Sequence, residues 1–195
     1  MRRLDLVVGP NGAGKSTFIA FTLASLLPGS LVVNANEIAR QRWPEDPAAH
    51  AYDAAQVAAD TRAKLIDLGR SFIAETVFSH PSKLGLVHAA RRAGFTVVLH
   101  TLLIPEGLAV ERVRHRVRAG GHDVPETKVR ERHRRLWTPV TEAIALSDVA
   151  TGYDNSRLRG PRIVARLSGG MTIGCLDWPA WTPAILRSRW PDEAT

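Results

Sequence analysis

Cysteine is almost absent from this chain of 195 residues, which contains only Cys175. A single cysteine cannot form an internal disulfide bond. The first residues also lack the order of charged, apolar and small residues that marks a secretory signal. Both features predict a cytoplasmic protein.

Long apolar runs are missing too. The longest, Phe18 to Leu27, has about half of the ~20 residues that a membrane-spanning helix requires. Because it directly follows a glycine-rich segment, we expect a buried helix there and no membrane partner. Apolar residues make up 45% of the chain and charged residues 23%, proportions that indicate a folded globular protein and not a disordered one. The length fits one domain, residues 1–195.

Positive charge is concentrated in one part of the sequence. The formal net charge is +7, and the segment from Glu111 to Arg135 contains nine Arg or Lys residues against four acidic ones. Such a cluster neutralises phosphates, either of a polynucleotide or of a nucleoside triphosphate. The segment has no aromatic residues on which bases would stack. A nucleic acid is therefore the less favoured partner, although a polynucleotide kinase or an RNA-binding protein stays an alternative.

The first two thirds of the chain alternate between short apolar runs and amphipathic segments. Alternating strands and helices predict an α/β fold with right-handed crossovers and a doubly wound parallel sheet. The expected strands are Leu4–Val8, Ser30–Asn34, Ser71–Thr76, Phe95–Ile104, Val149–Tyr153 and Arg162–Leu167. The expected helices are one beginning near Lys15, followed by Pro47–Leu68 and Pro81–Arg92.

Beyond Pro105 the rhythm changes. Helices are predicted over Leu108–Arg118 and Pro125–Leu146, with Gly120 and Gly121 between them. We interpret residues 106–146 as a helix–loop–helix insertion whose glycines permit the hinge movement of a lid. The last segment, residues 170–195, contains three tryptophans, which we expect to dock the tail by packing: Trp178, Trp181 and Trp190.

The strongest functional pattern lies at residues 9–17. Gly9-Pro10-Asn11-Gly12-Ala13-Gly14-Lys15-Ser16-Thr17 matches the phosphate-binding motif G-x-x-x-x-G-K-[ST] between a predicted strand and a predicted helix. Glycines let backbone N–H groups turn toward a phosphate at the helix N-terminus. Lys15 would reach the β- and γ-phosphates of ATP, and the Ser16 hydroxyl would bind Mg²⁺. This pattern predicts ATP and Mg²⁺ as cofactors, with residues 9–17 contacting the nucleotide.

Polar residues follow the second and third predicted strands. Ligands of open parallel sheets bind beyond the carboxyl ends of the strands, so Asn36, Glu37, Glu75 and Thr76 are expected to face the γ-phosphate. A carboxylate there could accept a proton from the substrate hydroxyl or hold the metal's water shell. Glu37 has an alternative explanation, since an acid is favoured in the first turn of any helix. Glu75 ends an apolar strand, where an unpaired carboxylate is costly, which favours a functional role.

The ordered set of motifs resembles the zeta-toxin family of P-loop kinases and its small bacterial relatives. The resemblance covers about four fifths of the chain and rests on these segments: residues 9–17, Val33–Ala39, Glu75-Thr76, Arg116 with Gly120–Glu126, and Tyr153–Ser156.

This resemblance implies ATP-dependent phosphorylation of a hydroxyl on a small metabolite, such as the sugar nucleotide UDP-N-acetylglucosamine. It also implies roles for individual residues. Lys15 would polarise the γ-phosphate, and Arg116, with His122 or Arg132, would stabilise the transferring group. Asn36, Glu75, Thr76, His122 and Arg132 would surround the substrate. Residues 153–156, including Asn155, would lie near the adenine. An antitoxin protein is a further partner that the resemblance raises.

One position departs from the family pattern. The family has aspartate as general base in a segment similar to Asn-Ala-Asp-Glu-Ile-Ala, and this chain has Asn36 there. An amide cannot accept the proton, and Glu37 or Glu75 could substitute for the aspartate. Phosphoryl transfer depends mainly on positioning and charge stabilisation, so activity does not require the aspartate. A catalytically silent nucleotide-binding protein is the second hypothesis.

Overall fold

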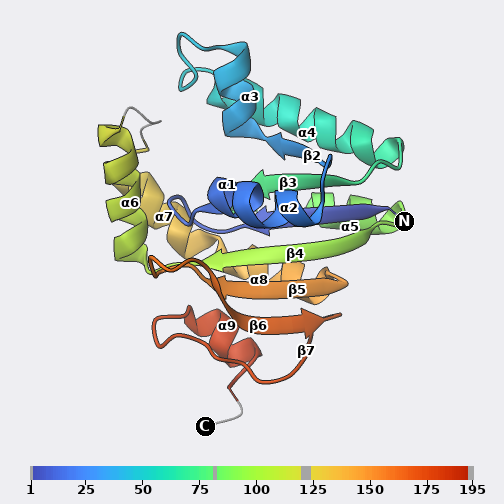
Figure 1. The fold of residues 1–195 in the computed structure, drawn as a ribbon, viewed down its shortest axis with the longest axis vertical. Coiled ribbons are helices and arrows are strands. Elements are labelled where there is room, and N and C mark those ends of the chain that lie inside the picture. Colours follow the sequence, from blue (N-terminus) through green and yellow to red (C-terminus); the bar gives the residue numbers. More distant parts are fainter. Residues whose placement is uncertain (1, 81–82, 120–123, 193–195) are drawn as a thin grey trace.

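The structure, a computed structural model, describes residues 2–80, 83–119 and 124–192. The described residues form one seven-stranded sheet with the order β2-β3-β1-β4-β5-β6-β7 (Figure 1). Its strands are β1 (Arg3–Val8), β2 (Leu31–Asn34), β3 (Phe72–Thr76), β4 (Thr96–Leu103), β5 (Val149–Asp154), β6 (Arg162–Ser168) and β7 (Met171–Thr172).

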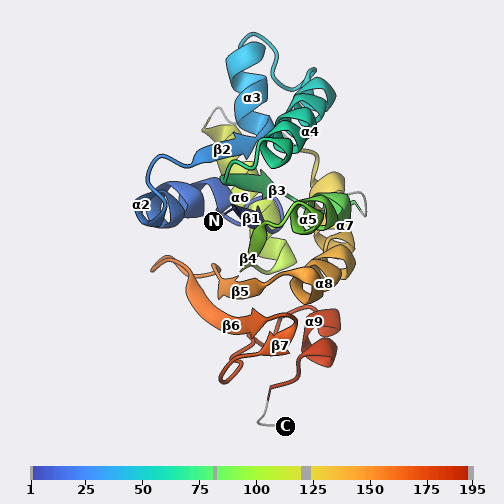
Figure 2. The ribbon, with the colours of Figure 1, turned by 90° about the vertical axis from the view of Figure 1, so that its right-hand side faces the viewer.

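Helices connect and cover the strands. Those in the described ranges are α1 (Lys15–Phe18), the π-helical turn η1 (Ile19–Leu23), α2 (Ala24–Leu26), α3 (Ala35–Arg42), α4 (Ala51–Asp67), α5 (Leu84–Arg92), α6 (Glu106–Arg118), α7 (Glu126–Arg135), α8 (Trp137–Leu146) and α9 (Ala184–Arg189). Helix α2 lies on one side of the sheet, and α5 and α8 lie on the other (Figure 2). Within these ranges, no helix has both the length and the apolar character needed to cross a membrane.

The predicted α/β class is confirmed, but the sheet is mixed and not purely parallel. Strands β1 to β5 pair in parallel, whereas β6 is antiparallel to β5 and β7 to β6. The reason is the length of the connections. A parallel crossover needs about a dozen residues, more than the segment between Asp154 and Arg162 supplies. Gly169 and Gly170, both with positive φ, form the tight hairpin between β6 and β7.

Two apolar clusters form the core, one on each face of the sheet. In β1 the side chains alternate between the clusters: Leu4, Leu6 and Val8 belong to the one that includes residues of α4, α5 and α8, and Val7 belongs to the one that includes residues of the first helical segment and α6. At the centre of the second face, Asp5 is buried and paired with Arg3 and His100. The strands therefore hold the loop after β1 between two packed layers.

The segment Phe18 to Leu27 is helical, but the prediction that it is buried is wrong for one of its faces. Phe18, Ile19 and Leu23 are buried, whereas Phe21 is 82% exposed and Leu26 is 70% exposed. The segment covers the sheet with a single side and contains the π-helical turn η1. Apolar content alone did not distinguish a helix with one buried face from a fully buried one.

The predicted helix over Pro125–Leu146 is in fact two helices, α7 and α8, that meet at Leu136. Pro139 explains the break. A proline ring clashes with the carbonyl four residues earlier, and residue 135 is the last of α7. The structure also contains α3, for which the sequence analysis gave no bounds, although it considered Glu37 as an acid in the first turn of a helix. Helix α4 begins at Ala51 instead of Pro47.

The tryptophans of the last segment pack as predicted. Trp178 and Trp190 are buried in the larger core cluster, and Trp181 packs against it. Their indole N–H groups have partners: that of Trp178 donates to the Trp190 carbonyl at 2.9 Å, and that of Trp190 donates to the Gly170 carbonyl at 2.8 Å.

Candidate functional site: a phosphate loop facing a cationic cavity

The loop after β1 adopts a conformation that requires glycine. Gly12 and Gly14 have φ values of 77° and 82°. These lie in the left-handed region, where a Cβ atom is disfavoured. A Cβ on Gly12 would also lie 2.8 Å from the Ala109 carbonyl oxygen. Helix α6 therefore packs directly against the loop, and helix α1 begins at Lys15, as predicted.

Lys15 is buried beneath this loop. Its ammonium donates hydrogen bonds to the carbonyl oxygens of Gly9 at 3.0 Å and Pro10 at 2.9 Å. Burial lowers the pKa of Lys15 to about 8, an effect that nearby Glu75 opposes and Arg116 reinforces. Within the described part of the chain, the hydrogen bonds of the ammonium go to neutral carbonyl groups, so a polyphosphate would be a far stronger partner.

Glu75, at the end of β3, accepts hydrogen bonds from the first turn of α1 and from the end of β2. The Ser16 hydroxyl donates to its carboxylate, at 2.9 Å from Oε2, and the Asn34 amide donates to Oε2 at 2.7 Å. Asn34 also caps α3, because its Oδ1 accepts from the backbone N–H of Asn36 at 2.9 Å. The first turn of α1 and the carboxyl ends of β2 and β3 are thus joined through one carboxylate.

These groups face a cavity of about 620 Å³. Most of the predicted site residues line it: Asn11, Gly12, Gly14, Lys15, Ser16, Thr17, Asn36, Glu75, Thr76, Arg116 and Arg132. Its lining residues come from the loop after β1 and from α1, β3, α6 and α7, among others. Figure 1 shows β3 and β4 pointing toward the side of the molecule where α6 lies. The fold therefore brings together residues that are far apart in the sequence.

Other predicted residues lie elsewhere. Glu37 is outside the cavity on the exposed side of α3, where it accepts from Gln41 at 3.0 Å and pairs with Arg40 at 3.5 Å. Gly9 and Ala13 are buried behind the cavity wall. His122 lies outside the described residues.

Residues 153–156, the segment expected near the adenine, contact the phosphate loop through Asn155. The Asn155 amide donates to the Ala13 carbonyl oxygen at 2.7 Å, and Arg112 of α6 donates to the Asn155 carbonyl oxygen at 3.0 Å. The Tyr153 ring packs against Phe18 and His100, with centroids 4.8 Å and 6.1 Å away. Asn155 and Arg112 thus support the loop, and the Tyr153 ring belongs to the packed layer beneath it.

Sequence reasoning missed three cations that line the cavity, Arg40, Arg62 and Lys83. A signal for Arg62 was present. It lies four residues after Ala58 and three before Leu65, on the buried face of α4, where a charged residue interrupts an apolar stripe. Lys83 follows a segment read only as a loop and helix start, so nothing in its sequence context marked it.

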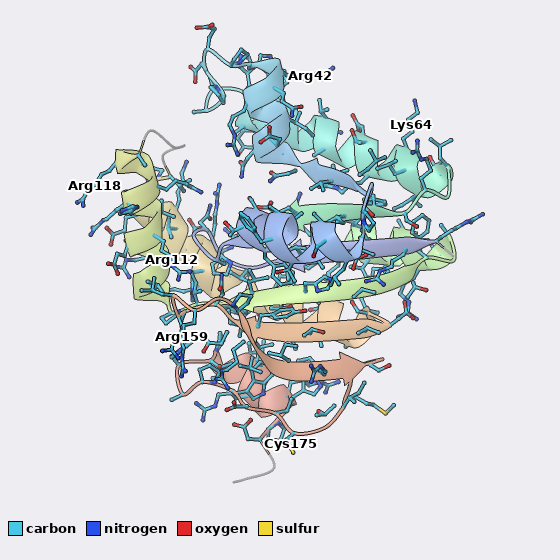
Figure 3. The ribbon with its side chains drawn as sticks, viewed as in Figure 1. Arg42, Lys64, Arg112, Arg118, Arg159 and Cys175 are labelled. Atoms are coloured by element: carbon cyan, nitrogen blue, oxygen red, sulfur yellow. The ribbon has the colours of Figure 1, made fainter. Side chains whose placement is uncertain are left out.

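The arginine-rich helices are largely neutralised by their own acids. Arg130 pairs with Glu106 at 2.8 Å and with Glu126 at 2.7 Å, and Arg134 pairs with Glu106 at 3.0 Å. Arg114 also pairs with Glu126. The arginines that line the cavity on these two helices are Arg112, Arg116 and Arg132. The cluster is therefore divided between a cross-linked outer surface and a cationic cavity wall. Figure 3 shows two of its arginines, Arg112 and Arg118, on α6.

The residues present fit a magnesium ion shared with a nucleotide. Within the described ranges there is no group of three or more His, Cys, Asp or Glu side chains arranged to bind a metal. Mg²⁺ in phosphoryl-transfer sites keeps several waters and needs only one or two protein oxygens besides the phosphates. The Ser16 hydroxyl, with Glu75 behind it, supplies that chemistry.

Comparison with known proteins agrees with this architecture. Residues 4–139, more than half of the chain, match a family described as AAA domain. A search of curated proteins finds no significant match. Among solved structures, a chain from the PezAT toxin–antitoxin system of Streptococcus pneumoniae has a TM-score of 0.63 at 14% identity, covering 85% of this chain and 72% of that one.

Two other solved structures show the same fold. A chain of the AvrRxo1-ORF1:AvrRxo1-ORF2 complex has a TM-score of 0.68 at 15% identity and covers 89% of this chain, which spans only 60% of that chain. A gluconokinase from Sinorhizobium meliloti has a TM-score of 0.53 at 17% identity, covering 80% of this chain and 84% of that one. At these identities the likeness shows the fold.

Fold and loop together define an α/β P-loop domain, similar in architecture to the chain from the PezAT system. The chain belongs to the AAA-domain family that matches residues 4–139.

Proposed function

We propose that this protein is an ATP-dependent phosphotransferase that moves the γ-phosphate of ATP to a hydroxyl group of a small metabolite. The observation that carries the proposal is the shared cavity. It places the phosphate loop, the Glu75 carboxylate and arginines of α6 and α7 around one space. Phosphoryl transfer needs these components, a cradle for the β- and γ-phosphates and cations for the developing charge.

In this proposal the phosphate loop holds the triphosphate. Backbone N–H groups of residues 11–16 and the N-terminus of α1 would surround the β-phosphate, and Lys15 would exchange its carbonyl partners for phosphate oxygens. When bound, Mg²⁺ supplies charge neutralisation between the β- and γ-phosphates, and Ser16 would be its protein ligand. Glu75 would hold a water of the metal or the acceptor.

Arg116 and Arg132 approach from the two helices that follow β4. Burial and the charge of Arg40 lower the pKa of Arg116, and Glu75 opposes the effect, so these side chains share one electrostatic environment. A guanidinium keeps its charge when desolvated and binds two phosphate oxygens at once. We assign Arg116, supported by Arg132, to the transferring phosphoryl group.

The acceptor would enter beside Asn36 and Thr76, which line the cavity with Glu75. Asn36 cannot accept a proton, and Glu37 lies outside the cavity. Glu75 is therefore the carboxylate proposed to receive the hydroxyl proton. From the resemblance to zeta toxins we propose a sugar nucleotide similar to UDP-N-acetylglucosamine as one candidate acceptor.

The test is a search for the phosphorylated product. Purified protein is incubated with ATP, Mg²⁺ and a metabolite extract, and mass spectrometry identifies species that gain one phosphate. We expect such a species with the wild type and none with Lys15→Ala. Identical product profiles would contradict the kinase function and favour the silent nucleotide-binding alternative, which Asn36 motivates.

A protein partner is also proposed. The PezAT chain comes from a toxin–antitoxin system, and the AvrRxo1 chain was solved in an ORF1:ORF2 complex. By analogy, an antitoxin-like protein would bind this chain. Copurification of an untagged partner with the tagged protein from its native cells would test this, and a monomeric protein without a stoichiometric partner would argue against it.

A further inference from the structure

Hydroxyl groups of the protein itself lie on the wall of the cavity. The described residues that place a hydroxyl side chain there are Ser16, Thr17, Thr76 and Ser79. Ser16 donates to Glu75, and Thr17 belongs to the phosphate loop. The Thr76 hydroxyl accepts from the Phe78 backbone N–H at 3.3 Å. The Ser79 hydroxyl makes no hydrogen bond within the described part of the chain, and the function proposed above does not use it.

A strained turn keeps Ser79 at the cavity. Phe78 is fully buried and has a φ of 64°, the one positive value found for a non-glycine among the described residues. Strand β3 ends at Thr76, yet Val77, Phe78 and Ser79 still line the cavity. Strain of this kind persists mainly at ligand and active sites. The turn therefore indicates that the position of Ser79 serves a function.

Two cations that the triphosphate site does not use line the same cavity, Arg62 of α4 and Lys83 just before α5. Arg62 is only 7% exposed, and within the described part of the chain its guanidinium has no hydrogen bond or ion pair. Burial lowers the pKa of both residues, and the charge of Arg62 adds to the effect on Lys83. Because an uncompensated buried cation is costly, a group that becomes negative beside these two residues would be stabilised.

We propose that this protein phosphorylates its own Ser79 when ATP is bound and no acceptor fills the cavity, and that Arg62 and Lys83 then hold the phosphoserine. This inference rests on the proposed function and adds a modification site to it. Serine is uncharged, whereas phosphoserine carries about two negative charges at pH 7, which two cations neutralise. The planar guanidinium also suits two of the phosphate oxygens.

The transfer balances as an ordinary phosphoryl transfer. The Ser79 Oγ attacks the γ-phosphorus of ATP and forms a new O–P bond. The bond from the γ-phosphorus to the oxygen that bridges it to the β-phosphate breaks, and ADP leaves with that oxygen and its electron pair. The proton of the Ser79 hydroxyl passes to the Glu75 carboxylate, the group proposed above to receive the proton of the metabolite.

The modification would regulate the protein. A phosphoserine at position 79 fills part of the cavity that the acceptor must enter, and it adds negative charge to the space that receives the γ-phosphate. Transfer to the metabolite is therefore inhibited. The protein inactivates itself when ATP is present and the acceptor is scarce.

The test uses the whole purified protein, treated with a phosphatase that is then removed, and incubated with ATP and Mg²⁺ without any acceptor. Mass spectrometry of the intact chain counts the phosphates gained, and fragmentation of its peptides locates them. We expect one phosphate on the wild type, at Ser79, and none on Ser79→Ala or Lys15→Ala. Ser25→Ala is the matched control and should be modified like the wild type, since the Ser25 hydroxyl is outside the cavity lining and donates to the Thr22 carbonyl at 2.8 Å.

Transfer within one chain has a kinetic signature. Because Ser79 lines the cavity of its own chain, the rate constant should stay the same over roughly a tenfold range of protein concentration. In a mixture, the wild type should leave Lys15→Ala unmodified. A rate constant that rises with concentration would show transfer between chains and contradict the inference.

The role of the two cations is tested by Arg62→Gln, which should accumulate phosphoserine at least about tenfold more slowly, because a cation that binds the arriving phosphoryl group is missing. Without ATP this variant should be as stable as the wild type, since it removes an unpaired buried charge. Lys64→Gln, on the exposed side of α4 (Figure 3), should match the wild type in both measurements. An unchanged rate in Arg62→Gln would contradict the role of the cations.

Three results would overturn the inference: a wild type that phosphorylates a metabolite of the extract but not itself, a phosphate on a residue other than Ser79, or a fully phosphorylated protein that keeps its full turnover. If the wild type phosphorylates neither Ser79 nor any metabolite, the proposed kinase function fails as well. The two failures are therefore distinguishable.

Discussion

Two asparagines, Asn34 and Asn36, lie two positions apart and have different surroundings. Both ends of the Asn34 amide are used, one by Glu75 and the other by the backbone of α3. Asn36 lines the cavity, in the position where the zeta-toxin pattern has the aspartate base. Substituting each asparagine separately therefore tests a structural role at position 34 and a catalytic role at position 36.

We predict that Asn36→Asp raises kcat about tenfold or more, since a positioned general base contributes ~10²-fold or more in favourable cases. The measurement is steady-state turnover with the acceptor identified from the extract. Asn34→Asp serves as the contrast, because it would place a second carboxylate against Glu75 and should lower turnover. An unchanged kcat in Asn36→Asp would show that the reaction does not depend on a base at this position.

The two ends of helix α6 have different surroundings. Its early residues, including Ala109, Val110 and Val113, pack in the core, and Arg112 clamps the loop. Arg116 lines the cavity, and Arg118, two residues later, is exposed and labelled near the other end of the helix in Figure 3. Any lid movement would therefore involve the later turns and not the whole helix.

We predict that Arg116→Ala lowers kcat about a hundredfold or more while the affinity for ATP changes less than tenfold, because losing one transition-state donor typically costs ~10²-fold or more. Turnover and nucleotide binding are measured separately. Arg118→Ala should match the wild type in both. If Arg116→Ala reduced binding and turnover equally, Arg116 would be a ground-state contact only.

Some of these elements could be predicted from the sequence and others could not, and the difference has physical reasons. The phosphate loop was predictable because its conformation is encoded locally, by Gly12, Gly14 and Lys15 in adjacent positions. The cationic wall was not, because Arg62 and Lys83 meet only after α4 and β3 have packed. The direction of β6 depended on the short connection before it. The end of α7 depended on Pro139. The periodicity of apolar residues in strands and helices indicates neither feature.

At the scale of the whole molecule, a buried polar network links the sheet to the helix that follows the phosphate loop. Asp5 accepts from Arg3 at 2.7 Å and lies 3.0 Å from the ring of His100, which contacts Phe18 and Tyr153. Burial by itself would raise the pKa of Asp5, but hydrogen bonds from His100 and Arg3 outweigh burial and lower it. The ionised carboxylate therefore stabilises the folded state.

We predict that Asp5→Asn lowers the free energy of unfolding by about 3 kcal/mol at pH 7, as expected when one member of a buried pair is removed. Because the folded pKa is the lower one, this stabilisation is complete above the unfolded pKa of about 4 and is lost as the pH falls through the folded pKa. Urea unfolding at pH 7 and below pH 4 checks both parts. Asp60→Asn, on the exposed side of α4, should change little at either pH, and a constant difference for Asp5→Asn would contradict the linkage.

The account depends most on the phosphate loop binding a nucleoside triphosphate, and calorimetric titration with ATP and Mg²⁺ tests this directly. We predict a saturable heat at pH 7 that is lost in Lys15→Ala. Because burial holds the pKa of Lys15 at about 8, the wild-type affinity should fall roughly tenfold per pH unit above that value as the ammonium deprotonates. Absence of heat from the folded wild type at pH 7, or equal affinity in Lys15→Ala, would contradict the account.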